Sequence, residues 1–524
     1  MPSTGPVATA TEITVTNPAD GRIVGRVPDT PPAEVARIVA DLRAEQPAWE
    51  AIGPAGRAVW LQRLRDWCLD NAERITEVIR SETAKPEAEA GFEGPALCDM
   101  LNYHAKHAER FLADKRPRPH NLLTATKRLT TTFRPYPVVG IISPWNFPFT
   151  MPGMDAVPAL AAGAAAVLKP SEVTPLSALE LVRGWAEIGA PPVLACVTGA
   201  GETGAAVVDH VDFVQFTGST RTGRAVARRA GERLIPASLE LGGKDAAIVL
   251  ADADLDRAVN GIAWGALMNS GQVCVSIERV YVEAPVYEEF VARLVEHVRS
   301  LRQGVDEGDF AADIGALATE AQVRIVEEHV DGAVAGGAKA LTGGRRTGTG
   351  TFFEPTVLVD VDHSMACMRD ETFGPTIPVM KVADADDAVR LVNDSPYGLS
   401  ATVWTRDRRR GETLARRLEA GAVNVNDVLT NLFCQPLPHG GWKQSGLGSR
   451  FGGAAGVRKY CRQQVITASL VPTPRRELLW YPYTARRGRL AARLLRAVVA
   501  RDARRRTGLQ LAGRTPRREG EPCP

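Results

Sequence analysis

Closely spaced cysteine pairs are absent from this sequence. Its eight cysteines are scattered over 524 residues, and no Cys-x-x-Cys motif occurs. Structural zinc sites and disulfide frameworks depend on short, regular cysteine spacings, so the sequence predicts neither, and we expect no metal site. A reducing cytosol, which keeps thiols free, is the compartment that this pattern fits.

Long apolar runs are also missing. No run reaches the roughly 18 residues that a membrane-spanning helix needs, and residues 1–20 lack the basic and apolar regions of a secretory signal. We therefore expect a cytoplasmic protein. A hydrophobic content of 44% and a charged content of 24% are typical of a globular chain. The length predicts about two to four domains, and the chain contains no internal repeat.

The net charge of +2 is unevenly distributed. From Arg475 onward, 14 arginines face four acidic residues, which gives this tail a charge of +10 and leaves −8 on the rest. The mildly acidic body argues against a nucleic-acid groove, and the tail is a basic appendage. Within it, Ala485–Arg506 has the pattern of an amphipathic helix. Its apolar face comprises Leu490, Leu494, Leu495, Val498 and Val499.

Three interpretations of this predicted helix remain open. It docks on the protein's own body or on a neighbouring subunit, it binds reversibly to an anionic membrane surface, or it is disordered. A chain ending near Leu470 is the natural comparison for distinguishing them.

The order of apolar patterns predicts the fold class. From Pro31 to Asp114, apolar residues recur at three- and four-residue spacing, which indicates helices. Short apolar runs typical of buried strands then alternate with helical stretches, and a second alternating region spans roughly residues 252–451. This alternation predicts parallel α/β sheets with a nucleotide site at a carboxyl edge. The first predicted strands are Val138–Ile142, Ala164–Leu168, Val193–Val197, Phe213–Phe216 and Ala246–Leu250, with helices at Pro175–Ile188 and Arg221–Arg233.

Three side chains are candidates for catalysis. Cys274, in a turn after Gly271, suits a thiolate nucleophile, although most cysteines are inert core residues. Glu240, before Gly242, suits a general base, although a strand end often carries an ordinary carboxylate. Asn146, between two prolines, suits a donor to an oxyanion, although such an asparagine is also common in turns.

These residues lie in a set of motifs that resembles the NAD(P)-dependent aldehyde dehydrogenase superfamily. The motifs occur in the family's order from about Thr14 to about Ile466, and the segment Gly271 to Glu283 is most similar to bacterial succinate-semialdehyde dehydrogenases. The motifs are Pro144–Pro148, Leu168–Glu172, Phe216–Thr220, Glu240–Lys244, Gly271–Ser276 and Glu371–Pro375.

The resemblance implies an α/β fold of several parts. We expect a Rossmann-type NAD-binding domain in residues 1–115 and 136–242 and an α/β catalytic domain in 243–452. A small β oligomerisation arm would comprise 116–135, with an extended hairpin at Asn121–Pro135, and 453–470, with a strand at Gln463–Leu470. Residues 471–524 form the basic C-terminal extension. In the family such an arm builds the interface of a homodimer or homotetramer, so we expect one here.

The resemblance also implies the reaction. Cys274 attacks the aldehyde to form a thiohemiacetal, Asn146 and the Cys274 N–H hold the oxyanion, and Glu240 activates water to hydrolyse the thioester. The substrate is an aldehyde such as succinic semialdehyde. Since relatives that transfer the acyl group to coenzyme A typically lack this glutamate, the CoA-acylating alternative is disfavoured. A non-catalytic NAD-binding protein on the same fold is the other alternative.

Cofactor and substrate residues follow from the same resemblance. The cofactor contacts are Trp145, Lys169, Glu172, Gly218, Ser219, Leu241, Glu371 and Phe373. Glu172 would repel a 2′-phosphate, so we expect NAD, with NADP as the alternative. The helix start after Gly218 suits a pyrophosphate, but it is not a G-x-G-x-x-G motif. The expected substrate pocket comprises Phe147, Met151, Met154, Val273, Val275 and His439.

Two of the polar residues leave their roles open. His439 is either a wall residue or a hydrogen-bond partner for a polar substrate tail. Arg279 either pairs with a substrate carboxylate or forms a structural charge pair beside Glu278. The sequence does not choose among semialdehyde, aliphatic and aromatic substrates.

Overall fold

The computed structural model describes residues 12–121, 124–308, 310–473 and 475–507. The chain divides into two compact units: a body, residues 1–112 and 134–462, and an arm unit, residues 113–133 and 463–524. Among the described residues, none of the helices combines the length and the apolar character of a membrane span.

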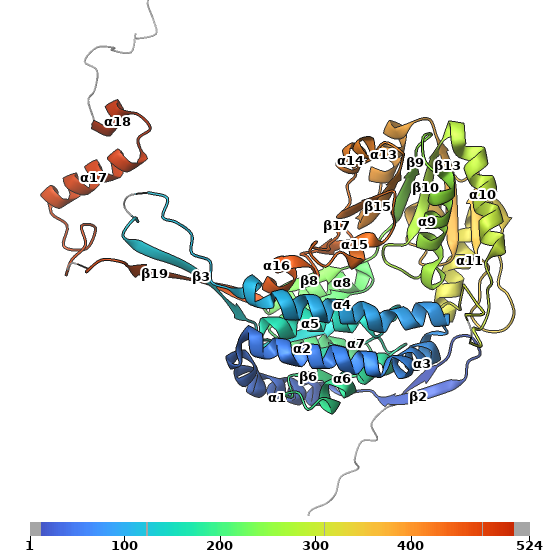
Figure 1. Ribbon diagram of the computed structural model, residues 1–524, viewed down its shortest axis with the longest axis horizontal. Coiled ribbons are helices and arrows are strands. Elements are labelled where there is room, and N and C mark those ends of the chain that lie inside the picture. Colours follow the sequence, from blue (N-terminus) through green and yellow to red (C-terminus); the bar gives the residue numbers. More distant parts are fainter. Residues whose placement is uncertain (1–11, 122–123, 309, 474, 508–524) are drawn as a thin grey trace, which may run out of the picture. The chain divides into compact units, whose positions relative to one another are not determined.

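Four helices occupy the region in which the sequence predicted helices (Figure 1). They are α1 (Pro32–Ala51), α2 (Gly53–Asp70), α3 (Ala72–Thr83) and α4 (Glu87–Leu112). Their apolar stripes are buried: α2 buries Leu61, Leu64 and Cys68, and α4 buries Leu97 and Leu101. A small antiparallel pair, β1 (Glu12–Thr16) and β2 (Ile23–Pro28), precedes them.

The first sheet has six strands in the order β18-β8-β7-β4-β5-β6. All neighbours are parallel except β18, which is antiparallel to β8. Central strands β4 and β5 are buried at every position, as expected for a sheet covered on both faces. The strands are β4 (Val138–Ile142), β5 (Ala165–Lys169), β6 (Leu194–Cys196), β7 (Phe213–Thr217), β8 (Ala237–Glu240) and β18 (Gly446–Leu447). The helices between them are α5 (Thr150–Ala162), α6 (Leu176–Glu187), α7 (Gly201–His210) and α8 (Thr220–Glu232).

The second sheet has seven strands in the order β11-β12-β13-β10-β9-β15-β16. Only β11 runs antiparallel to its neighbour. The strands are β9 (Asp245–Val249), β10 (Ile277–Glu283), β11 (Lys339–Thr342), β12 (Thr356–Val359), β13 (Thr376–Val382), β15 (Ser400–Trp404) and β16 (Ala422–Val425). The helices are α9 (Leu255–Leu267), α10 (Tyr287–Ser300), α11 (Glu320–Ala335), α12 (Ala366–Arg369), α13 (Ala385–Asn393), α14 (Arg408–Ala415), α15 (Thr430–Phe433) and α16 (Gly453–Arg458).

Alternate residues of this sheet enter two different cores. Val249 and Val280 belong to one core with residues of α9 and α10, whereas Ile248 and Tyr281 belong to another with residues of α11 and α13. Because side chains alternate across a strand, these cores lie on the two faces of the sheet. Figure 1 shows α9 and α10 on the side of β10 opposite to α13 and α14.

The arm strands correct one detail of the predictions. In Asn121–Pro135, of which residues 121 and 124–135 are described, the described part has one strand, β3 (Lys127–Pro135). The returning chain is upstream, where Lys115 and Thr131 exchange backbone hydrogen bonds of 2.9 Å. β3 pairs with β19 (Cys461–Ser469) (Figure 1). The second segment of the arm unit begins at Gln463, and α16 packs on α4 and α5.

The predicted C-terminal helix is interrupted. It divides into α17 (Ala485–Val499) and α18 (Ala503–Thr507). Ala500 has extended backbone angles, and the Asp502 side chain accepts the Arg505 N–H at 2.7 Å. This capping of a new turn accounts for the break.

Candidate active site

The predicted site residues gather between the two sheets of the body. In the first sheet, Ile142 of β4 is level with Lys169 of β5 and with Phe216 of β7, so the segments after these strands meet at one carboxyl edge. In the second sheet, Ile277 at the start of β10 is level with Asp245 at the start of β9. Glu240 is the last residue of β8, at the carboxyl edge of the first sheet, and Cys274 lies shortly before β10, at the amino edge of the second sheet. The two side chains are close enough for the Glu240 charge to affect the pKa of Cys274.

A cleft of about 710 Å³ lies at the carboxyl edge of the first sheet. A second space of about 270 Å³ shares Trp145, Gly218 and Ser219 with it and extends to Cys274. Together the two spaces, called here the dinucleotide cleft, include all eight expected cofactor residues: Trp145, Lys169, Glu172, Gly218, Ser219, Leu241, Glu371 and Phe373.

The walls of this cleft fit a dinucleotide. Gly201 and Gly204 open helix α7 without side chains, which lets a ligand approach the backbone. Ser219 caps α8 by accepting the Thr222 N–H, and a helix N-terminus attracts phosphate. On the adjacent wall, Lys169 Nζ lies 3.4 Å from Glu172 Oε2.

An apolar cavity of about 80 Å³ lies on the other side of Cys274. Five of the six expected substrate residues line it, together with further apolar side chains from α4, η1 (Met268–Gly271) and α15. Val275 does not line the cavity: it is buried in the core of the second sheet. The lining includes Phe92, Met100, Phe147, Met151, Met154, Met268, Val273, Leu429, Leu432, Phe433 and His439.

Cys274 lies where the cleft and the cavity meet, since its side chain lines both. Burial raises the pKa of the thiol to about 12; Arg450 opposes this shift, and the charges of Asp245 and Glu240 add to it. The resting thiol is therefore neutral, and it must lose its proton before it attacks.

The turn before Cys274 has an unusual backbone. Asn269, Ser270 and Gly271 all have positive φ, at 53°, 57° and 75°, a conformation that L-residues rarely adopt. A Cβ on Gly271 would lie 2.1 Å from the Gly374 carbonyl oxygen, so only glycine fits there. Such strain needs supporting contacts.

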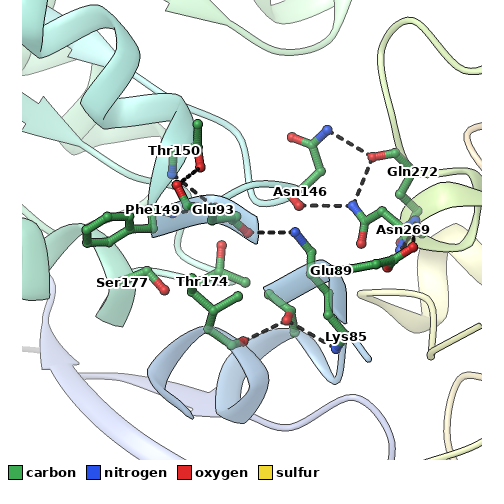
Figure 2. Close-up of polar contacts among 12 residues, drawn as sticks. Lys85, Glu89, Glu93, Asn146, Phe149, Thr150, Thr174, Ser177, Asn269 and Gln272 are labelled. Carbon is green, nitrogen blue, oxygen red and sulfur yellow. Dashed lines mark hydrogen bonds and ion pairs between the residues drawn. The ribbon is translucent and has the colours of Figure 1, made fainter. Parts of the chain in front are cut away.

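Figure 2 shows the contacts that supply this support. Glu89 accepts the Asn269 N–H at 2.8 Å. The Asn269 amide donates to the carbonyl oxygen of Asn146 at 2.9 Å and to that of Gln272 at 3.1 Å. Asn269 thus joins the Asn146 turn to the Cys274 turn, and Glu89 at the start of α4 holds Asn269 in place.

A buried ion pair beside this network holds the start of α5 (Figure 2). Lys85 Nζ lies 2.7 Å from Glu93 Oε1, and both side chains are almost completely buried. The other Glu93 oxygen accepts the N–H groups of Phe149 and Thr150 at 3.1 and 3.0 Å, so its charge lies at the positive end of the helix. Lys85 Nζ also lies 3.9 Å from the Phe147 ring centroid, which fixes one wall of the apolar cavity.

The Asn146 amide is oriented for donation. Its Nδ2 donates one hydrogen to the Gln272 carbonyl oxygen at 2.9 Å, and an amide nitrogen carries a second hydrogen. Asn146 lines the dinucleotide cleft beside Cys274. Its second hydrogen makes Asn146 the candidate donor to an oxyanion beside Cys274.

Substitution of Asn146 tests this assignment. Asn146→Ala is expected to lower kcat about 100- to 1,000-fold, the usual effect of losing one oxyanion donor, with a smaller change in the Kd of the dinucleotide. Steady-state kinetics and a binding titration measure the two effects. Asn431→Ala, an asparagine of α15 that does not line the cavity, is the control. Equal kcat values for the two variants would contradict the assignment.

Glu240 is a buried carboxyl without a hydrogen-bond partner among the described residues. Its Oε2 lies 3.7 Å from His439 Nε2. Burial raises its pKa to about 8, against the opposing charges of Arg450 and Lys459. A carboxyl with such a pKa is suited to accept a proton near neutral pH. Burial lowers the pKa of His439 to about 3, so this imidazole is neutral.

Glu371 lies at the end of the cleft near Cys274, on a turn that is held from behind. One Glu371 oxygen accepts the Gly243 N–H at 2.9 Å, and burial raises its pKa to about 8. Glu278 forms a buried ion pair of 2.7 Å with Lys244 and accepts the Thr372 N–H at 2.7 Å. The Glu371 turn is thereby anchored to the turn that carries Glu240.

The arginine that lines the cavity and the arginine singled out from the sequence are both already engaged. Arg450 lines it, but donates twice to Asp155, at 3.1 and 2.7 Å. Arg279 is buried outside the cavity lining and donates to backbone carbonyl oxygens, including that of Lys244 at 2.9 Å. The sequence left two roles open for Arg279. The ion pairs of the described residues include neither a pair of Arg279 with Glu278 nor one with another carboxylate, and Glu278 pairs with Lys244.

Several supporting residues were absent from the predictions. Glu89, Glu93 and Lys85 lie in the predicted helical region, where charged residues usually face solvent. The only sequence signal for them is the concentration of charge at a helix start near Pro86, and that signal does not specify burial.

Comparison with known proteins identifies close relatives. The profile of the aldehyde dehydrogenase family matches residues 7–466. The chain is 41% identical to a 4,4'-diapolycopene aldehyde oxidase from Methylomonas sp over 484 residues, which cover 91% of this chain and 89% of the relative. Two solved structures superpose with TM-scores of 0.84. One is a succinate-semialdehyde dehydrogenase from Burkholderia pseudomallei (35% identity, covering 88% of this chain and 95% of the other). The other is an NAD-dependent aldehyde dehydrogenase from Sinorhizobium meliloti (33% identity, covering 89% and 93%).

Proposed function

Because the chain belongs to the aldehyde dehydrogenase family, we propose that it oxidises an extended apolar aldehyde with NAD⁺. The balanced reaction is aldehyde + NAD⁺ + H₂O → carboxylate + NADH + 2 H⁺. The observation that carries the proposal is the position of Cys274, whose side chain lines both the dinucleotide cleft and an apolar cavity.

Each catalytic side chain has one task. The Cys274 thiolate adds to the carbonyl carbon, and the Asn146 amide with the Cys274 N–H stabilises the oxyanion of the thiohemiacetal. NAD⁺, when bound, accepts the hydride. The acyl group then remains on the Cys274 sulfur as a thioester, and Glu240 takes a proton from the water that hydrolyses it.

The charges around the cavity favour an apolar substrate over succinic semialdehyde. A substrate carboxylate taken out of water needs a cationic partner. Arg450 is already paired with Asp155, and burial keeps His439 neutral. Among the described residues that line the cavity there is thus no uncommitted cation. The relative named for 4,4'-diapolycopene aldehyde supports the same choice, whereas the Burkholderia relative supports the semialdehyde.

An aldehyde panel tests the proposal. We expect kcat/KM for decanal to exceed that for succinic semialdehyde at least about tenfold, since each buried methylene contributes about 0.8 kcal/mol. NADH formation is followed at several concentrations of hexanal, decanal, benzaldehyde and succinic semialdehyde. A preference for succinic semialdehyde would contradict the apolar substrate class but not the NAD-dependent oxidation of an aldehyde. No NADH with any aldehyde would overturn both.

Glu172 supports NAD as the cofactor, because its carboxylate on the cleft wall would repel a 2′-phosphate. We expect Glu172→Gln to shift the NADP/NAD ratio of kcat/KM toward NADP about tenfold, which corresponds to about 1.4 kcal/mol. Glu202→Gln, on the exposed surface of α7 outside the cleft lining, is the matched control. Unchanged ratios in both variants would mean that Glu172 does not read the ribose.

The strand pair β3–β19 supports a homodimer or homotetramer. In the resembling family a hairpin of this kind builds the subunit interface, and the β19 residues Val465 and Ile466 are exposed in the single chain. Light scattering coupled to size exclusion measures the mass in solution.

A further inference from the structure

We propose that helix α17, with the aromatic segment that precedes it, binds the surface of an anionic membrane. This surface lies outside the residues 7–466 that match the family, and no step of the proposed reaction uses it. The proposal concerns residues 479–499 of the arm unit. It is argued from their exposed side chains and their charge.

Large apolar side chains of α17 are exposed. Leu490, Leu494, Leu495 and Val499 are 49%, 42%, 42% and 74% exposed. At 100° per residue these four side chains spread over about half of the helix circumference, and Ala491, which falls between them, is buried. Such a concentration of exposed leucine and valine on 15 residues marks a surface that another phase or molecule covers.

Four of the five arginines of α17 occupy the remaining arc; the fifth, Arg487, lies on the apolar side and donates to the Glu477 carbonyl oxygen at 2.8 Å. At 100° per residue, Arg486, Arg489, Arg493 and Arg496 fall together, opposite to the apolar side. None of these four forms an ion pair with a carboxylate in the part of the chain that the structure describes. The helix contains no acidic residue. Its charge is therefore available to an anionic surface.

The segment before the helix carries the side chains typical of a membrane interface. Trp480, Tyr481 and Tyr483 are 58%, 77% and 68% exposed, and the two tyrosine rings lie 4.7 Å apart. Tryptophan and tyrosine concentrate at the headgroup level of bilayers because their rings are amphipathic. Thr484 caps α17 directly after them, by accepting the Arg487 N–H at 3.3 Å.

A membrane surface fits these observations better than a second copy of the chain. The acidic body would attract the arginines, but the exposed tryptophan and tyrosines call for a partly wet interface at the edge of the apolar face. Arginines on one face, leucines on the other and low overall hydrophobicity are typical of helices that lie in a lipid headgroup layer. α17 is too short and too charged to span a bilayer.

Vesicle co-sedimentation of the full chain tests the proposal. Vesicles of phosphatidylcholine are compared with vesicles that also contain phosphatidylglycerol. We expect binding only to the anionic vesicles, weakening as salt is added. Leu490→Gln with Leu494→Gln should weaken binding at least about tenfold, because two buried leucine side chains are lost. Ala485→Gln with Ala492→Gln, the same number of changes on the arginine side, should stay within about twofold of wild type.

Two outcomes would overturn the proposal. One is the absence of binding to phosphatidylglycerol vesicles at low salt; the other is equal binding by the leucine variant and the wild type. In either case, a lower mass in light scattering for the leucine variant than for the wild type would assign this face to a second copy. Circular dichroism checks that both variants keep the helix content of the wild type.

The link between membrane binding and an apolar substrate rests on the proposed function, and a separate experiment measures it. Apolar aldehydes partition into bilayers, so a membrane-bound dehydrogenase meets them at high local concentration. With decanal supplied in anionic vesicles, the leucine variant should turn over at least about tenfold more slowly than wild type, in line with its loss of binding. With hexanal and no vesicles, the two should be equal. Vesicle binding without dehydrogenase activity would overturn only the proposed function.

Discussion

Replacing Cys274 by serine is expected to lower aldehyde oxidation more than about 1,000-fold, the scale found when an enzyme loses its covalent nucleophile. A serine hydroxyl is close in shape but far less acidic and less nucleophilic than a thiol. Burial raises the pKa of the Cys274 thiol to about 12, and it disfavours the far less acidic serine alkoxide in the same way. The measurement is NADH formation with the preferred aldehyde, alongside a dinucleotide titration.

Binding of the dinucleotide should survive this substitution. Cys274 contributes one residue to the wall of the cleft, while Trp145, Lys169 and Gly218 lie further along it. Cys434→Ser is the matched control, because Cys434 is also half-buried and lies next to the cavity residues Phe433 and Gln435. Retained oxidation in the Cys274 variant, or loss in the Cys434 variant, would mean that another thiol forms the covalent adduct.

Glu240→Gln is expected to lower the steady-state rate about 100- to 10,000-fold, the range that general bases contribute. A glutamine cannot take a proton from water, so the thioester on Cys274 should accumulate. The first half of the reaction should persist. The Glu240 charge raises the pKa of Cys274, and its removal therefore does not hinder thiolate formation.

Rapid mixing separates the two halves of the reaction. The variant should release one burst of NADH, close to the enzyme concentration, and then stop. Loss of the burst as well would show that Glu240 also deprotonates the thiol. Glu89→Gln makes the same change at the buried carboxyl that accepts the Asn269 N–H. It should reduce the burst and the steady rate together, because it displaces both the Asn146 turn and the Cys274 turn.

The pH dependence of the wild type follows from the same carboxyl. Only the ionised form of Glu240 accepts a proton, and burial raises its pKa to about 8. The fraction of the active form thus grows as the pH rises. If hydrolysis limits turnover, kcat should rise toward a plateau above about pH 8, and the burst variant should lack this rise.

The sheets of the body follow closely from the sequence. The five predicted strands correspond to β4, β5, β6, β7 and β9 within a residue or so at each end. Four of them, β4, β5, β7 and β9, are buried at every position, so their apolar runs are continuous and carry a strong signal. Strand–helix alternation then limits the topology, since parallel neighbours need crossover helices.

The arm and the C-terminal helix were less predictable. The chain that returns beside β3 does so upstream, through an isolated bridge between Lys115 and Thr131, where the sequence has no apolar alternation to mark it. The break between α17 and α18 depends on one side-chain cap by Asp502, a local interaction that competes with helix continuation. The amphipathic periodicity of the sequence continues through both helices and does not mark the break between them.

In the candidate site, too, some residues could be identified from the sequence and others could not. Turn motifs brought Cys274, Asn146 and the cofactor residues into consideration, and the structure places them around one cleft. Val275 was misplaced because its side chain packs into the core of the second sheet, and the turn motif does not specify this packing. The support by Glu89 and Glu93 depends on long-range contacts and on the left-handed backbone of residues 269–271. The periodic pattern of apolar residues in the sequence specifies neither of these.

The shared position of Cys274 in two cavities has a consequence for chemical labelling. A reagent that enters along the apolar side reaches the sulfur without competing for the dinucleotide's space. An electrophile on an alkyl chain would therefore act as an active-site probe in the presence of saturating cofactor. Its chain length would select among dehydrogenases by the depth and width of the methionine- and phenylalanine-lined passage.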